Sequence, residues 1–159
     1  MQSLGRTIGL LVVAALLAAP VLARAASPAG LCRQLGTDDR LHAIPQALVP
    51  DSERLFGLHS MPAEWVQRTT FFRCYDGHVF VCNVGANLPC GKANQSRELP
   101  GATAWCAKNP DAGFIPMYVT GHDTIYSWRC RASAAVPTAQ VFTVGPRGFI
   151  TQFWKPADP

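Results

Sequence analysis

The residues best suited to bind another molecule lie in 84–99, a stretch rich in Gly, Asn and Pro with no helix or strand periodicity. Arg97 can hold a carboxylate or a phosphate through two parallel hydrogen bonds. A loop of this length is either functional or tied to the rest of the fold, and Cys90 indicates a tie. The alternative is that its polar side chains bond the carbonyls of their own loop. The candidate binding residues of this stretch are Lys92, Asn94, Ser96 and Arg97.

His122 is the fifth candidate, in a turn formed by Gly121, His122 and Asp123. A carboxylate can orient an imidazole for base catalysis, although the side chains of adjacent residues diverge. The alternative is an ordinary turn in which Asp123 and Thr124 bond the local backbone. A small envelope hydrolase that uses His122 is therefore the enzyme hypothesis to weigh against a binding protein.

The chain has no complete catalytic, metal or nucleotide motif. It contains no Gly-x-Ser-x-Gly, no Cys-x-x-Cys and no His-x-x-x-His spacing. We therefore expect no metal, no cofactor and no enzymatic activity, and the leading hypothesis is a domain that binds an unknown protein or envelope ligand.

Six cysteines, all after residue 25, predict three disulfides, which can be connected in 15 ways. Asp76-Gly77 between two β-rich runs predicts a hairpin with a two-residue turn. In that register Cys74 lies opposite Val79 and Cys82 opposite Phe71, so the two cysteines point to opposite faces and cannot bond. The pairs that we predict are Cys90–Cys106, Cys74–Cys130 and Cys32–Cys82.

The remaining patterns predict a mainly β (α+β) fold, a single antiparallel β-rich domain with short peripheral helices. Short helices are expected at 50–57, 60–66 and 100–108, where Pro, acidic and capping residues open a turn. Strands are expected at 69–75, 78–83, 114–120, 124–131, 139–144 and 149–154. In the strand 124–131, Tyr126, Trp128 and Cys130 share the inward face. We expect 27–30 and 33–42 to be irregular and 132–138 to be a linker.

Residues 1–25 have the features of a signal peptide: Arg6, an apolar run, and Ala-Arg-Ala before the cleavage point. The mature domain is then 26–159, with an ordered core at about 41–155, and its location is periplasmic or secreted. Without Arg6 and Arg24 the net charge falls from +4 to +2, too little for nucleic-acid binding. No later segment is long enough to span a membrane.

Several motifs resemble a group of small uncharacterised exported proteins from proteobacteria. They are Arg-Cys-Tyr-Asp-Gly from Arg73, Gly-Ala-Asn-Leu-Pro-Cys ending at Cys90, Thr-Gly-His ending at His122, and Trp-Arg-Cys ending at Cys130. This resemblance implies export but no activity. The hairpin Cys74-Tyr75-Asp76-Gly77 also resembles that of bacterial C-type lysozyme inhibitors, although their Ser-rich inhibitory loop is missing. A lysozyme-inhibitor-like protein is therefore a further alternative.

Overall fold

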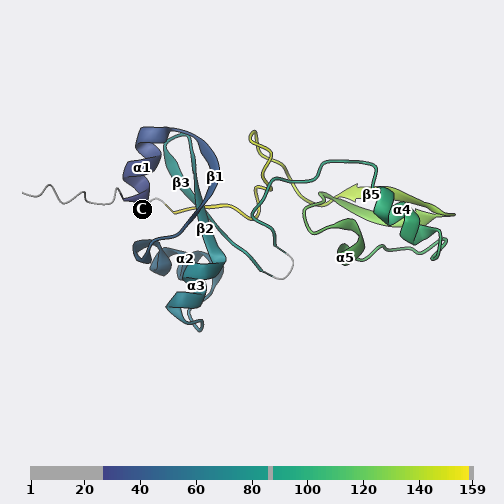
Figure 1. The fold of residues 1–159 in the computed structure, drawn as a ribbon, viewed down its shortest axis with the longest axis horizontal. Coiled ribbons are helices and arrows are strands. Elements are labelled where there is room, and N and C mark those ends of the chain that lie inside the picture. Colours follow the sequence, from purple (N-terminus) through teal and green to yellow (C-terminus); the bar gives the residue numbers. More distant parts are fainter. Residues whose placement is uncertain (1–26, 86–87, 158–159) are drawn as a thin grey trace, which may run out of the picture.

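The computed structural model describes residues 27–85 and 88–157, so the predicted signal peptide lies outside the described residues. The described chain forms two antiparallel sheets, short helices and three disulfides, which confirms the predicted fold class. The two sheets lie toward opposite ends of an elongated molecule (Figure 1). The elements in chain order are α1 (Pro28–Leu35), β1 (Asp38–Ala43), η1 (Gln46–Leu48), α2 (Val49–Phe56), α3 (Ala63–Thr69), β2 (Thr70–Tyr75), β3 (His78–Asn83), α4 (Pro100–Cys106), α5 (Met117–Thr120), β4 (Tyr126–Arg131), β5 (Ala134–Gln140) and β6 (Lys155–Pro156).

The first sheet has the strand order β1-β2-β3-β6, with every neighbouring pair antiparallel. Its centre is the predicted hairpin. Asp76 and Gly77 both have positive φ, 51° and 78°, as a two-residue turn of this hand requires. The register is also as predicted, with Cys74 opposite Val79 and Phe71 opposite Cys82.

Because side chains alternate along a strand, this register gives the hairpin two distinct faces. Phe72 and Cys74 point into the first core, which they share with residues of α1, α2 and α3. Phe71 and Phe80 belong to the other face and pack against the central core. The central core consists of Cys82, Cys90, Ile125, Phe149, Ile150, Phe153 and Trp154.

The second sheet pairs β4 with β5, and α4 packs beside it. Trp128 and Cys130 are buried there with Ala102 and Cys106 of α4, and this group forms the third core. Tyr126 packs partly against the same core, so the predicted inward face of this strand is confirmed. The predicted helices at 50–57, 60–66 and 100–108 are also confirmed as α2, α3 and α4.

The predictions for 132–138 and 114–120 were wrong, because strand pairing and the position of Pro116 outweighed the local composition. The expected linker 132–138 is largely β5, whose small residues hide a strand that only its pairing with β4 reveals. The expected strand 114–120 ends in α5, which begins after Pro116. Before that proline the chain follows the free edge of β4, where the Ile115 amide donates to the Trp128 carbonyl at 3.0 Å.

The N-terminal segment was expected to be irregular and instead contains α1 and β1. The Ser27 hydroxyl accepts a hydrogen bond from the Gly30 amide at 3.1 Å, and Pro28 occupies the first turn, so the helix begins with a standard cap. Among the described residues, regular structure therefore begins at Pro28.

The expected last hairpin forms its turn at 145–148 but makes only one bridge between its described arms, Val144 with Ile150. After Trp154 the chain returns to the first sheet as β6, beside β3. Residues 145–154 therefore lie against the hairpin face that carries Phe71 and Phe80.

The three predicted disulfide pairs were wrong, although the deduction that Cys74 and Cys82 do not bond is confirmed. The bridges are Cys32–Cys74, Cys82–Cys90 and Cys106–Cys130, and no described cysteine is free. Each core contains one bridge. In the fold, α1 crosses one face of the first sheet and reaches Cys74, the loop after β3 returns at once to Cys82, and α4 lies beside β4.

Candidate functional site

The predicted loop residues mainly hold the loop in place, which is the structural alternative. Lys92 Nζ lies 3.0 Å from Asp39 Oδ2. The Asn94 amide donates to the Asp123 carbonyl at 2.8 Å, and its side-chain oxygen accepts from the Ser96 amide at 2.9 Å. The Ser96 hydroxyl donates to the Glu98 carbonyl at 2.6 Å.

Arg97 and His122 do not form a joint site with Lys92. The exposed Arg97 guanidinium lies 5.0 Å from the Tyr126 ring centroid and borders two shallow cavities, neither of which His122 or Lys92 lines. His122 Nδ1 is buried and has no hydrogen-bond partner among the described residues. Within the described part of the chain, Nδ1 of His122 therefore lacks the orienting carboxylate that a hydrolase base would need.

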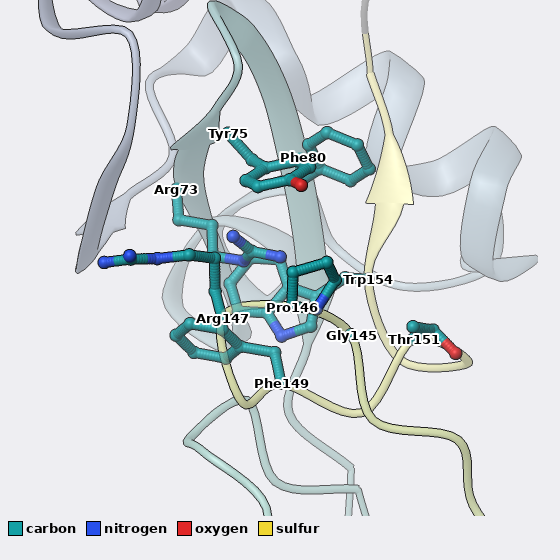
Figure 2. Close-up of a pocket in the computed structure, with 9 residues that line it drawn as sticks. All are labelled: Arg73, Tyr75, Phe80, Gly145, Pro146, Arg147, Phe149, Thr151 and Trp154. Carbon is teal, nitrogen blue, oxygen red and sulfur yellow. The ribbon is translucent and has the colours of Figure 1, made fainter.

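A different arginine has the surroundings of a binding site. Arg73 lies in the middle of β2, opposite Phe80 of β3, and only 7 % of its surface is exposed. Its guanidinium carbon lies 4.2 Å from the ring centroid of Phe149 and 4.9 Å from that of Trp154. The Tyr75 and Phe80 centroids are each at 5.6 Å, so four rings surround one cation (Figure 2).

The Arg73 side chain has no acceptor for its hydrogens among the described residues. Nε and Nη1 are fully buried and unpaired. Nη2 is not among the fully buried atoms, so it is the nitrogen that a molecule entering from outside meets first. Trp154 Nε1, in the ring that stacks beside the guanidinium, is also buried and unpaired. Buried donors without acceptors each cost about 1–3 kcal/mol, and a charged one costs more.

These groups border a cavity of about 120 Å³, here called the Arg73 pocket. The hairpin supplies one side and the turn at 145–148 with the segment that follows it supplies the other. Four of its nine lining residues are aromatic, so the surroundings of the cation offer rings rather than hydrogen-bond acceptors. The lining residues are Arg73, Tyr75, Phe80, Gly145, Pro146, Arg147, Phe149, Thr151 and Trp154.

An ion cluster lies at the rim of the Arg73 pocket. Asp39 Oδ2 accepts from Arg147 Nη2 at 2.9 Å and lies 3.0 Å from Lys92 Nζ. The hydrogen bond from Arg147 holds the pKa of Asp39 below its usual value. Two cations share this carboxylate while Arg73 stays unpaired, so the described groups around the pocket carry excess positive charge. Burial lowers the pKa of the Arg73 guanidinium from its usual value, because the rings remove water that would stabilise its charge.

Sequence reasoning missed Arg73 as a site residue, although a signal was present. The predicted register puts Phe71, Arg73 and Tyr75 on one face of β2, with Phe80 of β3 on the same face. A cation in the middle of an aromatic strand face must be either paired or exposed, unless it serves a ligand. The turn at 145–148 and Trp154 come from the other end of the chain, and the sequence did not place them beside this face.

A second cavity, the Trp128 cavity, provides a contrast. Its volume is about 150 Å³, and its lining residues are uncharged. Trp128 Nε1 donates to the Thr124 hydroxyl at 3.0 Å, so the indole there is paired. The lining residues are Phe114, Ile115, Met117, Thr120, Thr124, Tyr126, Ser127, Trp128, Val141 and Phe142.

No family model, no curated protein and no solved structure matches this chain. The function of this protein is therefore inferred from the geometry of the site. Among the described residues, no group of acidic, His and Cys side chains has the arrangement of a metal site. In the same part of the chain, no helix has the length and apolar character needed to cross a membrane.

Proposed function

We propose that this protein is an exported, non-enzymatic binding protein whose Arg73 pocket takes an anionic group of a cell-envelope component or of a protein. The observation that carries the proposal is the buried guanidinium of Arg73, which has no acceptor among the described residues. An anion that reached Nη2 would supply the missing partner, and the low polarity of the ring-lined wall would strengthen that interaction.

Export is supported by two independent features. Residues 1–25 have the composition of a signal peptide. All six cysteines form disulfides, which persist outside the reducing cytosol. Cleavage after Ala25 would leave a mature protein that begins at Ala26, and the mass of the protein recovered from a periplasmic or culture fraction tests this. An uncleaved chain would contradict it.

A purely structural reading of Arg73 is possible, since four rings can stabilise a cation by roughly 0.5–2 kcal/mol each. Rings alone, however, leave the hydrogen-bond donors of the guanidinium without acceptors. An apolar side chain would fill the same space without that cost. A buried arginine without an acceptor among the described residues is therefore better explained by a ligand that binds reversibly.

The test is a titration of the oxidised protein with acetate, benzoate, inorganic phosphate and sulfate at constant ionic strength, followed by NMR. The signals to follow are the Nε–H of Arg73 and the indole N–H of Trp154. We expect at least one anion to shift both signals to saturation.

The matched variants are Arg73→Met and Arg97→Met, because both arginines lie over aromatic rings but only Arg73 lies in the pocket. The Trp154 signal should stop responding in Arg73→Met and respond normally in Arg97→Met. The absence of any saturable shift in the wild-type protein, or an unchanged response in Arg73→Met, would contradict the proposal.

A further inference from the structure

The size of the Arg73 pocket limits what can enter it. At about 120 Å³ it is smaller than the roughly 300–1,000 Å³ of pockets that enclose a whole small ligand. Pro146 and Arg147 at its border are exposed, so an occupant can continue outward past the turn. The pocket is therefore suited to one terminal group of a longer molecule.

The charges around the pocket indicate a group with a single negative charge. Arg73 is the cation of the wall without an acidic partner, because Arg147 pairs with Asp39 at 2.9 Å. A monoanion can be neutralised by one guanidinium. A phosphate monoester would place its second charge among the rings, which is unfavourable because only Arg73, of the described cations at the pocket and its rim, lacks a salt-bridge partner. Lys92 and Arg147 already share Asp39 at the rim.

The ion cluster at the rim disfavours an occupant that carries a free ammonium group. Lys92 and Arg147 share the single carboxylate of Asp39, so the rim repels a further ammonium group. A free amino acid would carry its ammonium next to the carboxylate and so close to these cations. A peptide chain replaces that ammonium with a neutral amide, which removes the repulsion.

The walls add a preference for an apolar side chain. Tyr75, Phe80 and Trp154 present rings to the cavity (Figure 2), and these rings gain free energy when they are covered by apolar atoms. A carboxylate also has two acceptor oxygens, one for Nη2 of Arg73 and one for the indole N–H of Trp154. The indole nitrogen is enclosed, so the second bond requires the Trp154 ring to turn.

From these observations we infer that the Arg73 pocket binds the C-terminal residue of a peptide chain, with the free carboxylate on Arg73 and an apolar side chain against the rings. This inference rests on the proposed function and narrows it to one chemical class. It gives Arg73 the charge contact, Trp154 a second hydrogen bond, and the cationic rim the role of excluding free amino acids.

The test compares four small probes on the full oxidised protein, by calorimetry and by the indole N–H signal of Trp154. They are N-acetyl-L-leucine, N-acetyl-L-leucinamide, L-leucine and inorganic phosphate. We expect N-acetyl-L-leucine to bind at least tenfold more tightly than each of the other three, and Arg73→Met to weaken the binding of this probe at least tenfold.

The outcomes separate the two proposals. Tighter binding of phosphate than of either N-acetyl-leucine enantiomer, or binding of neither enantiomer more tightly than the amide, would overturn the peptide-terminus inference, while saturable phosphate binding would still support the anion pocket. If none of the probes binds, and the anions of the previous titration do not bind either, both proposals fail. N-acetyl-D-leucine as a fifth probe distinguishes the two sources of peptide ends, because cell-wall peptides contain D residues and protein termini do not. Tighter binding than the amide by either enantiomer supports the inference.

Discussion

Two cavities of this molecule have aromatic walls and similar volumes, about 120 and 150 Å³, but they differ in how their polar groups are paired. In the Trp128 cavity the indole N–H bonds to Thr124 at 3.0 Å. In the Arg73 pocket the indole N–H of Trp154 and two nitrogens of Arg73 are buried without a partner. A cavity alone therefore does not define a binding site. The two cavities differ in their unpaired hydrogen-bond donors, which a ligand can satisfy.

The largest effect should come from removing the disulfide nearest each cavity. Cys106–Cys130 closes 24 residues in the third core beside Trp128, and Cys82–Cys90 closes 8 residues in the central core beside the Arg73 pocket. The restriction of the unfolded chain predicts losses of about 3.5 and 2.5 kcal/mol for the two double Cys→Ala variants. Urea denaturation measures both. A larger loss for the shorter loop would mean that packing around the pocket, rather than loop length, sets the cost.

The next effect concerns the paired indole of the Trp128 cavity. Thr124→Val removes the hydroxyl that accepts from Trp128 Nε1 and leaves that donor buried and unpaired. We expect a loss of about 1–3 kcal/mol in the free energy of unfolding. Thr151→Val is the control because Thr151 is exposed, and it should change stability by less than about 0.5 kcal/mol. Equal effects of the two variants would remove the energetic distinction between the cavities.

Arg73→Met should have a smaller effect on stability, in contrast to its effect on binding. The substitution removes a buried charge whose desolvation is unfavourable, and this gain offsets the lost contacts with the rings. We expect the free energy of unfolding to stay within about 1 kcal/mol of the wild-type value or to rise. A loss above about 2 kcal/mol would identify Arg73 as a structural residue, and the Arg73 pocket would then not differ from the Trp128 cavity in the role of its polar groups.

The smallest effect concerns the rim of the Arg73 pocket and depends on pH. The pKa of Asp39 is lowered from 3.8 in the folded protein, so its contribution is complete above that pH and is lost as the pH falls through the folded value. Asp39→Asn lacks this contribution, so its melting temperature should fall less between pH 5 and pH 2.5 than that of the wild-type protein. A partly exposed ion pair contributes at most about 1 kcal/mol, so we expect a difference of at most about 4 °C. Parallel melting curves would show that Asp39 does not contribute.

Local signals in the sequence predicted the central hairpin of the first sheet, β2 and β3, but neither β1 nor β6. Asp76-Gly77 determined the hairpin register, and that register separated Cys74 from Cys82 correctly. The helices α2, α3 and α4 were also predictable, because Pro and acidic or Gly residues mark their ends, while α1 and α5 were missed. Such features depend on a few neighbouring residues and need no knowledge of tertiary contacts.

Long-range contacts explain what the sequence did not show. β5 is recognisable only from its pairing with β4, whereas α1 begins with a cap that its own sequence supplies, Ser27 followed by Pro28. The Arg73 pocket needs Phe149 and Trp154, which lie far along the chain from β2. The loop position of Arg97 predicts a binding residue from local sequence, whereas the role of Arg73 depends on residues from the other end of the chain.

The most direct measurement of the central claim is to locate a bound anion by crystallography. Crystals of the oxidised protein soaked in 3-bromopropionate would show the bromine by anomalous scattering and the carboxylate by its density. The account predicts bromine in the cavity among Tyr75, Phe80 and Trp154, with a carboxylate oxygen within hydrogen-bond distance of Arg73 Nη2. Bromine found only in the Trp128 cavity, or a carboxylate held only by Lys92 and Arg147 at the surface, would contradict it.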